Sequence, residues 1–188
     1  MKKLFLTLLV ALFGAVSLYA DDVAEVKMAI VRDCELAAKG DFLGSAARWT
    51  PDYQEVSPEG TMNYAQAKRA ILAMDGKHPE EYLLTVTMVR NGGVEPNPDM
   101  AEGIRLLAQA PEFLEKYQVA AKQMAEILKA SAALELKTLN FAGVKVDGDK
   151  ATAVLTYRHV IGGERQETVT LRKIDGEWRI ARRVVEQL

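Results

Sequence analysis

Two side chains that could take part in proton transfer, together with a serine, alternate along one predicted strand, at residues 52–57. Successive side chains of a strand point to opposite faces, so Tyr53, Glu55 and Ser57 share a face. A carboxylate there can act as a general base if burial raises its pKa, which makes Glu55, with Tyr53, the candidate catalytic pair. The alternative is an ion pair between Glu55 and an arginine, which is the more common arrangement and also perturbs a pKa.

The C-terminal quarter of the chain has the sequence pattern of a β-meander. Gly162-Gly163 and Asp175-Gly176 are typical of two-residue hairpin turns, and Asp147-Gly148-Asp149 marks a third turn. The runs between these turns are rich in β-branched and aromatic residues. The predicted strands are 137–146, 150–161, 164–174 and 177–186. Strands of this length must twist and curl, so the meander predicts a concave sheet.

Two-residue turns also predict the register of the meander. The predicted core face carries Val154, Thr156, Val169, Leu171, Trp178, Ile180 and Val184, joined by Leu139 and Phe141. The opposite face carries Tyr157, His159, Thr168, Thr170, Arg172, Arg179 and Arg183. His159 is therefore expected to be a surface or interface residue.

The same register brings three charged side chains together at one end of the core face: Arg158, Glu167 and Arg182. Charges at core positions must be paired or hydrated. They form either a buried salt-bridge trio or the rim of an open pocket. Because the guanidinium group binds carboxylates through a planar fork, a pocket rimmed by two arginines predicts a small anionic or polar ligand.

The first 20 residues are typical of a secretory signal peptide. Lys2 and Lys3 precede an apolar run from Leu4 to Val16, and Ala20 is a small residue before Asp21-Asp22. We expect cleavage after Ala20, a mature domain of residues 21–188, and a periplasmic or secreted location without stable membrane insertion after cleavage.

Composition excludes several classes of function. The chain has 188 residues and a formal net charge of −2, which gives no electrostatic case for nucleic-acid binding. Cys34 is the single cysteine, and its spacing with Val26, Ile30 and Ala37 favours a helix core position. No motif for a metal or a cofactor is present, so neither is expected.

Helices are predicted on both sides of the strand at 52–57. Residues 22–39 form the first helix, Asp41 caps a short helix at 42–49, and Asn63 with Gln66 forms a capping box for a helix through Met74. The segment at about 76–133 is predicted as a helical insertion. It either enlarges the core, covers the mouth of the fold, or mediates self-association.

These motifs, in this order, resemble NTF2-like (SnoaL-like) domains. The resemblance lies in Gly40-Asp41-Phe42-Leu43-Gly44, then Ala46 to Tyr53, then Pro58-Glu59-Gly60, and in the last hairpin from Ile174 to Ile180. It implies a cone-shaped α+β fold in which N-terminal helices pack on a curled antiparallel sheet dominated by the four-strand meander. Ketosteroid-isomerase-like members place an aspartate base before the proline of this motif. Here Ser57 precedes Pro58, which removes the expected base.

The expected function is therefore an exported, non-catalytic domain that binds a small molecule or a partner. The predicted pocket consists of Trp49, Tyr53, Glu55, Ser57, Arg158, Glu167 and Arg182. One alternative is an isomerase, dehydratase or hydrolase that uses Glu55. Another is an interaction module that forms a homodimer through the outer sheet face or the helical insertion.

Overall fold

The computed structural model describes residues 2–58, 60–160 and 163–188, and for residues 2–20 and 89 it describes the backbone alone. The helices are α1 (Lys2–Lys39), α2 (Phe42–Ala46), α3 (Tyr64–Ala73), α4 (Pro79–Arg90), α5 (Pro98–Ala108) and α6 (Pro111–Thr138). The strands are β1 (Trp49–Ser57), β2 (Gly60–Asn63), β3 (Asn140–Asp147), β4 (Lys150–His159), β5 (Gly163–Ile174) and β6 (Glu177–Gln187).

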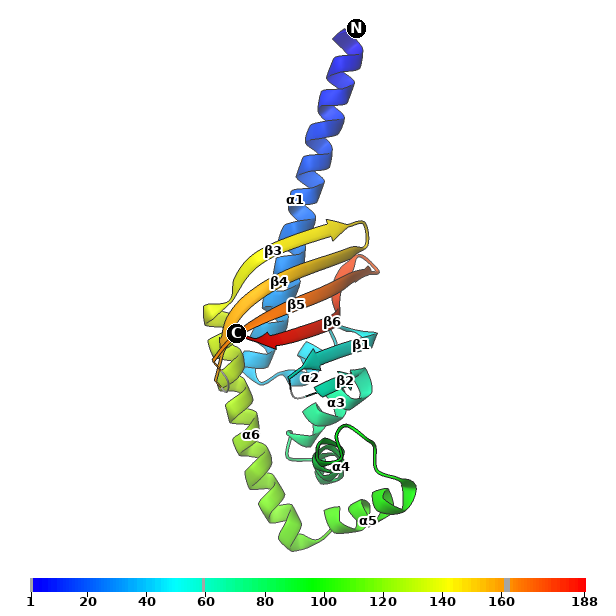
Figure 1. The fold of residues 1–188 in the computed structure, drawn as a ribbon, viewed down its shortest axis with the longest axis vertical. Helices are drawn as coiled ribbons and strands as arrows, with labels where there is room; N and C mark the ends of the chain where they lie inside the picture. The colour runs from blue at the N-terminus through cyan, green and yellow to red at the C-terminus, as the bar shows by residue number, and fades with distance from the viewer. Residues whose placement is uncertain (1, 59, 161–162) are drawn as a thin grey trace.

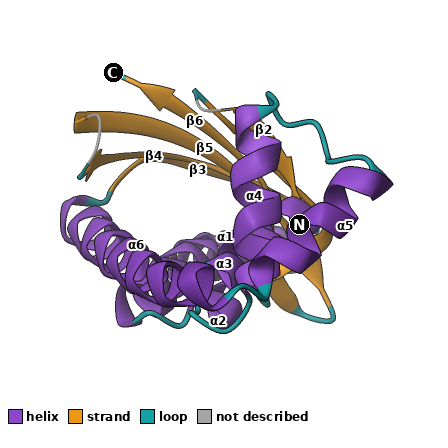
Figure 2. Cartoon of the chain, turned by 90° about the horizontal axis from the view of Figure 1, so that it is seen from below, coloured by secondary structure: helices purple, strands orange, loops and turns teal. Residues whose placement is uncertain are grey.

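All six strands form one mixed sheet in the order β2-β1-β6-β5-β4-β3. The pairs are antiparallel except β1 and β6, which run parallel. Seen from below, the sheet arches over α1, α3 and α6 (Figure 2). The predicted α+β fold, with helices packed on a curled sheet dominated by the C-terminal meander, is confirmed.

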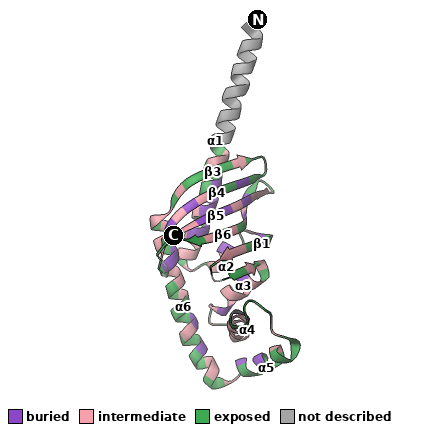
Figure 3. Cartoon of the chain, in the orientation of Figure 1, coloured by how far each residue is buried: buried purple, intermediate pink, exposed green. Residues whose placement is uncertain are grey.

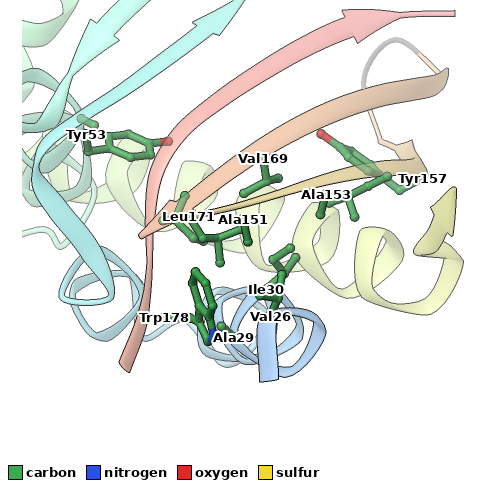
Figure 4. Packing of buried hydrophobic residues seen from close by; sticks show 13 residues of the cluster. Val26, Ala29, Ile30, Tyr53, Ala151, Ala153, Tyr157, Val169, Leu171 and Trp178 are labelled. Atoms are coloured by element: carbon green, nitrogen blue, oxygen red, sulfur yellow. The ribbon is translucent and has the colours of Figure 1, made fainter. Parts of the chain in front are cut away.

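The core lies between α1 and the concave face of the sheet (Figure 4). Val26 and Ile30 of α1 are fully buried against Val169, Leu171 and Trp178 of the sheet. Burial of each large apolar side chain stabilises a fold by about 1.5–3 kcal/mol. The predicted core positions Val169, Leu171, Trp178 and Ile180 are confirmed, and Leu139 and Phe141 pack partly buried against them.

The predicted N-caps of α2 and α3 are confirmed. Asp41 accepts a hydrogen bond from the Gly44 amide at 2.9 Å. Asn63 accepts one from the Gln66 amide, and its own amide donates to the Gln66 side chain, both at 3.0 Å. This reciprocal capping box fixes the start of α3. Strand β1 begins at Trp49, earlier than predicted, and α6 continues to Thr138, so β3 begins later than predicted.

The predicted register between β4 and β5 is wrong. Arg158 pairs with Glu164 instead of Glu167, and His159 pairs with Gly163. Gly163, which was predicted to be a turn residue, is therefore already paired as the first residue of β5, and the other predicted turn residue, Gly162, lies outside the described residues. The shift is an odd number of residues, so it exchanges the two faces of β4. Ala153, Leu155 and Tyr157 are buried, whereas Val154 and Thr156 are only half-buried.

A β-bulge changes the register between β5 and β6. The Asp175-Gly176 turn pairs Ile174 with Glu177 as predicted, and Leu171 with Ile180. Beyond that point Thr170 pairs with Arg182, so Ala181 is the additional residue. A bulge of one residue reverses the facing of every side chain after it relative to a regular ladder. Arg183 therefore takes the inward position that the sequence assigned to Arg182, and Val184 is half-buried on the other face.

The segment that was predicted as an insertion forms a helical arm. In Figure 1, α4, α5 and the first half of α6 lie below the sheet, and Figure 3 shows much of their surface exposed. The arm has a small aromatic cluster, in which the rings of Tyr82 and Tyr117 lie 5.3 Å apart and Phe113 stacks near Tyr117. The Tyr117 hydroxyl accepts a hydrogen bond from the His78 amide at 3.1 Å, which ties α6 to the start of α4. None of the helices in the described residues combines the length and apolar character that a membrane span requires.

Candidate functional site: a cavity with a charged end

A cavity of about 300 Å³ lies between the concave face of the sheet and the helices α1, α2, α3 and α6. Its apolar wall comes mainly from α3 and α6, including Ala70, Ile71, Met74 and Leu128. Its polar wall comes from α1, the C-terminal part of α6 and strands β1, β4, β5 and β6. Apolar surface with a few convergent polar groups is typical of small-molecule sites, and this volume is at the lower end of their range of about 300–1,000 Å³.

A buried ion-pair trio forms the base of the charged end. Arg183 of β6 donates to Glu167 of β5 at 2.6 Å and to Asp33 of α1 at 2.5 Å. Asp33 and Glu167 are 4% and 3% exposed, so three charges share an almost dry environment. Burial alone would lower the pKa of Arg183, but the charges of Glu167 and Asp33 raise that pKa well above its ordinary value. The guanidinium group therefore stays charged and holds both carboxylates in place.

Two further side chains fix Asp33. Ser45 of α2 donates its hydroxyl proton to Asp33 Oδ1 at 2.7 Å, and Trp49 donates from its indole nitrogen to the same oxygen at 3.1 Å. Both Asp33 oxygens thus accept hydrogen bonds, which offsets much of the cost of burying the carboxylate. Helix α2 and strand β1 are tied to α1 through this single side chain.

Tyr53 and Glu55 form a second polar pair in the cavity wall. The Tyr53 hydroxyl donates to Glu55 Oε2 at 2.8 Å. The Tyr53 ring is fully buried and stacks on Trp49, with ring centroids 4.3 Å apart. Burial raises the pKa of Tyr53 far above its ordinary value, so the phenol remains a donor. The predicted alternation of Tyr53 and Glu55 toward one face is confirmed.

A third polar group contains Glu135 of α6 and His159 of β4. Their nearest side-chain atoms, Glu135 Oε1 and His159 Nε2, are 3.6 Å apart, and Ser131 donates to the same carboxylate at 3.2 Å. Burial raises the pKa of Glu135 above its ordinary value. Tyr157 lies on the same face of β4, and its pKa is raised first by burial and then by the charge of Glu167.

Four of the seven predicted pocket residues line the cavity: Trp49, Tyr53, Glu55 and Glu167. Ser57 is not among the lining residues, and its hydroxyl lies 3.4 Å from the Gly60 carbonyl oxygen at the β1–β2 turn. Arg158 and Arg182 are exposed, and neither lines this cavity. The predicted trio is therefore wrong in two of its members. The observed β4–β5 register places Arg158 on the outer face, and the bulge in β6 does the same for Arg182.

The cavity is also lined by five chemically active side chains that were not predicted from the sequence: Asp33, Glu135, Tyr157, His159 and Arg183. Tyr157, His159 and Arg183 were assigned to the wrong face by the register errors. Asp33 had a detectable signal, because it follows Val26 and Ile30 at helical spacing and so had to point into the core. Cys34 is buried as predicted and lines the cavity beside Asp33; burial raises the pKa of its thiol to about 12, which makes it a poor nucleophile.

The charged end has an excess of carboxylates. Four carboxylate side chains line the cavity, namely Asp33, Glu55, Glu135 and Glu167, against two guanidinium groups, Arg165 and Arg183. The formal charge of these six side chains together is −2. Within the described residues, no three His, Cys, Asp or Glu side chains are grouped so that they could hold a metal ion.

The sequence matches no known family model and no curated protein. Its fold is similar to solved structures described as NTF2-like. An NTF2-like protein with a cystatin-like fold from Novosphingobium aromaticivorans has 18% identity and a TM-score of 0.46, over 94% of this chain and 88% of that one. An NTF2-like protein of unknown function from Silicibacter pomeroyi has 13% identity and a TM-score of 0.46, over 89% of this chain and 96% of that one.

A third such structure, an NTF2-like protein of unknown function from Shewanella baltica, has 8% identity and a TM-score of 0.44, over 89% of this chain and 94% of that one. Solved structures named NTF2-like are thus among those to which the fold of this chain is similar. These similarities concern the fold alone.

Proposed function

We propose that this protein is an exported binding protein that holds a small molecule in the cavity and does not catalyse a reaction on it. The observation that carries the proposal is the division of the cavity into an apolar wall and an end built from buried ion pairs. Such an arrangement gives a ligand both burial and orientation. Residues 21–188 are proposed to be the mature domain.

Two features favour binding over catalysis. Ser57 stands before Pro58 and does not line the cavity, so no base lies at the position that the family resemblance indicates. Asp33 and Glu167 are both ion-paired with Arg183, so both already serve as its counter-ions. The expectation of a small polar or anionic ligand rested on Arg158 and Arg182, and neither of these side chains lines the cavity.

The test is mass spectrometry of small molecules that co-purify with the protein from its native compartment, followed by thermal denaturation with the compound found. A ligand that binds only the folded state must raise the melting temperature. Ala70→Trp fills the cavity from α3 and should abolish this shift, whereas Ala65→Trp, at an exposed position of the same helix, should retain it. An equal shift in both variants would place the ligand elsewhere and contradict the proposal.

A catalytic role for Glu55 remains the second candidate, because Tyr53 donates a 2.8 Å hydrogen bond to it inside the cavity. If the co-purified compound is converted on incubation, Glu55→Gln should abolish turnover while the compound still raises the melting temperature. Turnover that is unchanged in Glu55→Gln would exclude Glu55 as the base.

Self-association is the third candidate, and the arm supports it. Leu106 and Leu107 of α5 are 65% and 51% exposed, and Val119 of α6 is 56% exposed. Sedimentation velocity of the mature protein should then show a dimer that Leu106→Glu dissociates. Val94→Glu, at an equally exposed loop position, is the matched control. A protein that stays monomeric at all concentrations would contradict self-association.

A further inference from the structure

A second cavity, of about 330 Å³, lies beside the first and shares three of its lining side chains, Phe42, Ile71 and Met74. We propose that the two cavities are the chambers of one elongated site for an amphiphile with a primary-amine head and an unbranched apolar tail. This inference rests on the proposed binding function and names its ligand class. Each chamber alone is at the lower limit for a ligand site, whereas the two together lie well inside that range.

Helices α1 and α6 pack against each other and show the order of the chambers. Asp33 and Ala37 of α1 line the inner chamber, and Gly40, which directly follows the helix, lines the outer one. An α-helix rises 1.5 Å per residue, so α1 rises by about 9 Å from Asp33 to its end at Lys39.

Helix α6 gives the same order in the reverse chain direction. Ala125 lines the outer chamber, Leu128 lines the apolar part of the inner one, and Glu135 lies at the charged end. From Ala125 to Glu135 the helix rises by about 15 Å. Two independent helices therefore place the charged end and the outer chamber at opposite ends of a long, narrow site.

The charged side chains of the inner chamber favour a ligand with a positively charged head group. Asp33 and Glu167 already balance Arg183, and the lining as a whole has two more carboxylates than guanidinium groups. Glu135 is held by Ser131 and lies 3.6 Å from His159. An ammonium group beside Glu135 would offset the cost of its burial, whereas a carboxylate there would add a like charge.

The partition between the chambers consists of side chains that a tail can displace. Met74 is an unbranched, adaptable side chain, and Phe42 comes from the five-residue helix α2. Beyond them the outer chamber is lined by Leu43 and Leu72. A methylene chain that passes Met74 therefore continues to bury apolar surface, and a longer tail should bind more tightly.

The test is calorimetric titration of the mature protein with n-alkylamines from butyl to decyl and with the matching n-alkanoic acids. Amine affinity should rise about threefold to fourfold per methylene, which corresponds to about 0.8 kcal/mol each. The rise should continue beyond the chain length that fills the inner chamber. Glu135→Gln should weaken all the amines by about tenfold, the scale of one lost hydrogen bond to a charged group.

Blocking the outer chamber separates the two parts of the proposal. Ala125→Trp should stop the gain in affinity at a shorter tail and leave butylamine binding unchanged. Met124→Trp, at an exposed neighbouring position, should leave the whole series unchanged. If Ala125→Trp does not fold, as judged by far-UV circular dichroism, Leu72→Trp blocks the same chamber from α3.

Acids that bind as tightly as amines would overturn the assignment of the head group. An amine series that stops improving at butylamine, with no effect of either blocking variant, would overturn the two-chamber site and leave the binding function standing. If no amine binds while a co-purified compound gives a thermal shift that Ala70→Trp abolishes, the ligand class is wrong and the binding function holds. The binding function itself fails if that shift survives in Ala70→Trp.

Discussion

Arg182 and Arg183 are neighbours on β6 with opposite surroundings. Arg183 is in contact with Glu167 and Asp33 in the dry end of the cavity, whereas Arg182 is exposed. The sequence shows two identical side chains in a row, and only the bulge at Ala181 decides which of them points inward. The pair therefore offers a comparison in which side-chain chemistry is constant and burial differs.

Replacing Arg183 with Met should lower the free energy of unfolding by about 3–5 kcal/mol, because it leaves two buried carboxylates without their cation. Arg182→Met should change it by no more than about 0.5 kcal/mol, as expected for a surface position. Urea denaturation of both variants at neutral pH measures the difference. Equal effects would contradict the register of β6.

Glu135 should make the free energy of unfolding depend on pH. Its folded-state pKa is raised by burial above the value of 4.5 expected in the unfolded chain. As the pH rises above about 4.5, the unfolded state therefore releases this proton first and gains stability relative to the folded state. The favourable contribution is complete below pH 4.5 and is lost as the pH rises through the folded-state pKa.

Relative to Glu135→Gln, which does not titrate, the wild type should therefore gain stability as the pH falls from 7 to about 4.5. Melting temperatures of both proteins across this range measure the gain. Glu115→Gln, at an exposed position of the same helix, should track the wild type at every pH. A constant offset between Glu135→Gln and the wild type would contradict the raised pKa.

At the scale of elements, what could be predicted depended on how local the signal was. The capping box at Asn63, the cap at Asp41 and the Asp175-Gly176 turn involve contacts within three residues, and all three are confirmed. The face to which a side chain of β4 points depends on the register with β5, and at the end of β6 it depends on the bulge at Ala181. Neither the register nor the bulge has a unique sequence signal. A register that is wrong by an odd number of residues assigns side chains to the opposite face, and this happened for Tyr157, His159 and Arg183.

Asn63→Ala should destabilise the protein by about 1 kcal/mol, because it removes the acceptor for the Gln66 amide. Asn63→Ser retains an acceptor and should cost only a few tenths of that amount. Thermal denaturation measures both variants. Since α3 also lines the cavity, the alanine variant should bind the ligand more weakly at temperatures near its transition.

At the scale of the whole molecule, α1 joins the predicted signal peptide to the core. Asp22 and Glu25 bind Lys173 at 2.9 and 3.1 Å, so this part of the helix is tied to the sheet. Cleavage after Ala20 would leave a helix whose first turn carries Asp21 and Asp22, which the helix dipole favours.

If residues 1–20 are a signal peptide as predicted, the mature protein should begin at Asp21. Intact mass measurement of the protein recovered from the periplasm or medium checks this, and Ala20→Trp, which replaces the small residue at the cleavage site, should keep the precursor uncut. A recovered protein that retains residues 1–20 would contradict the signal-peptide hypothesis.

The parallel pairing of β1 with β6 has a kinetic consequence. Trp49 pairs with Ile180, and Glu55 pairs with Arg183, so one of the first strands to be synthesised lies beside the last. Folding rates fall as contacts become more distant in sequence, and here β6, the strand that joins β1 to β5, follows the other five strands of the sheet in the chain. A chain that stops at Gly176 has no partner for β1 other than β2. The sheet of the nascent chain should therefore stay incomplete until β6 has been synthesised, and this delay would favour transport in an unfolded state if the protein is exported as proposed.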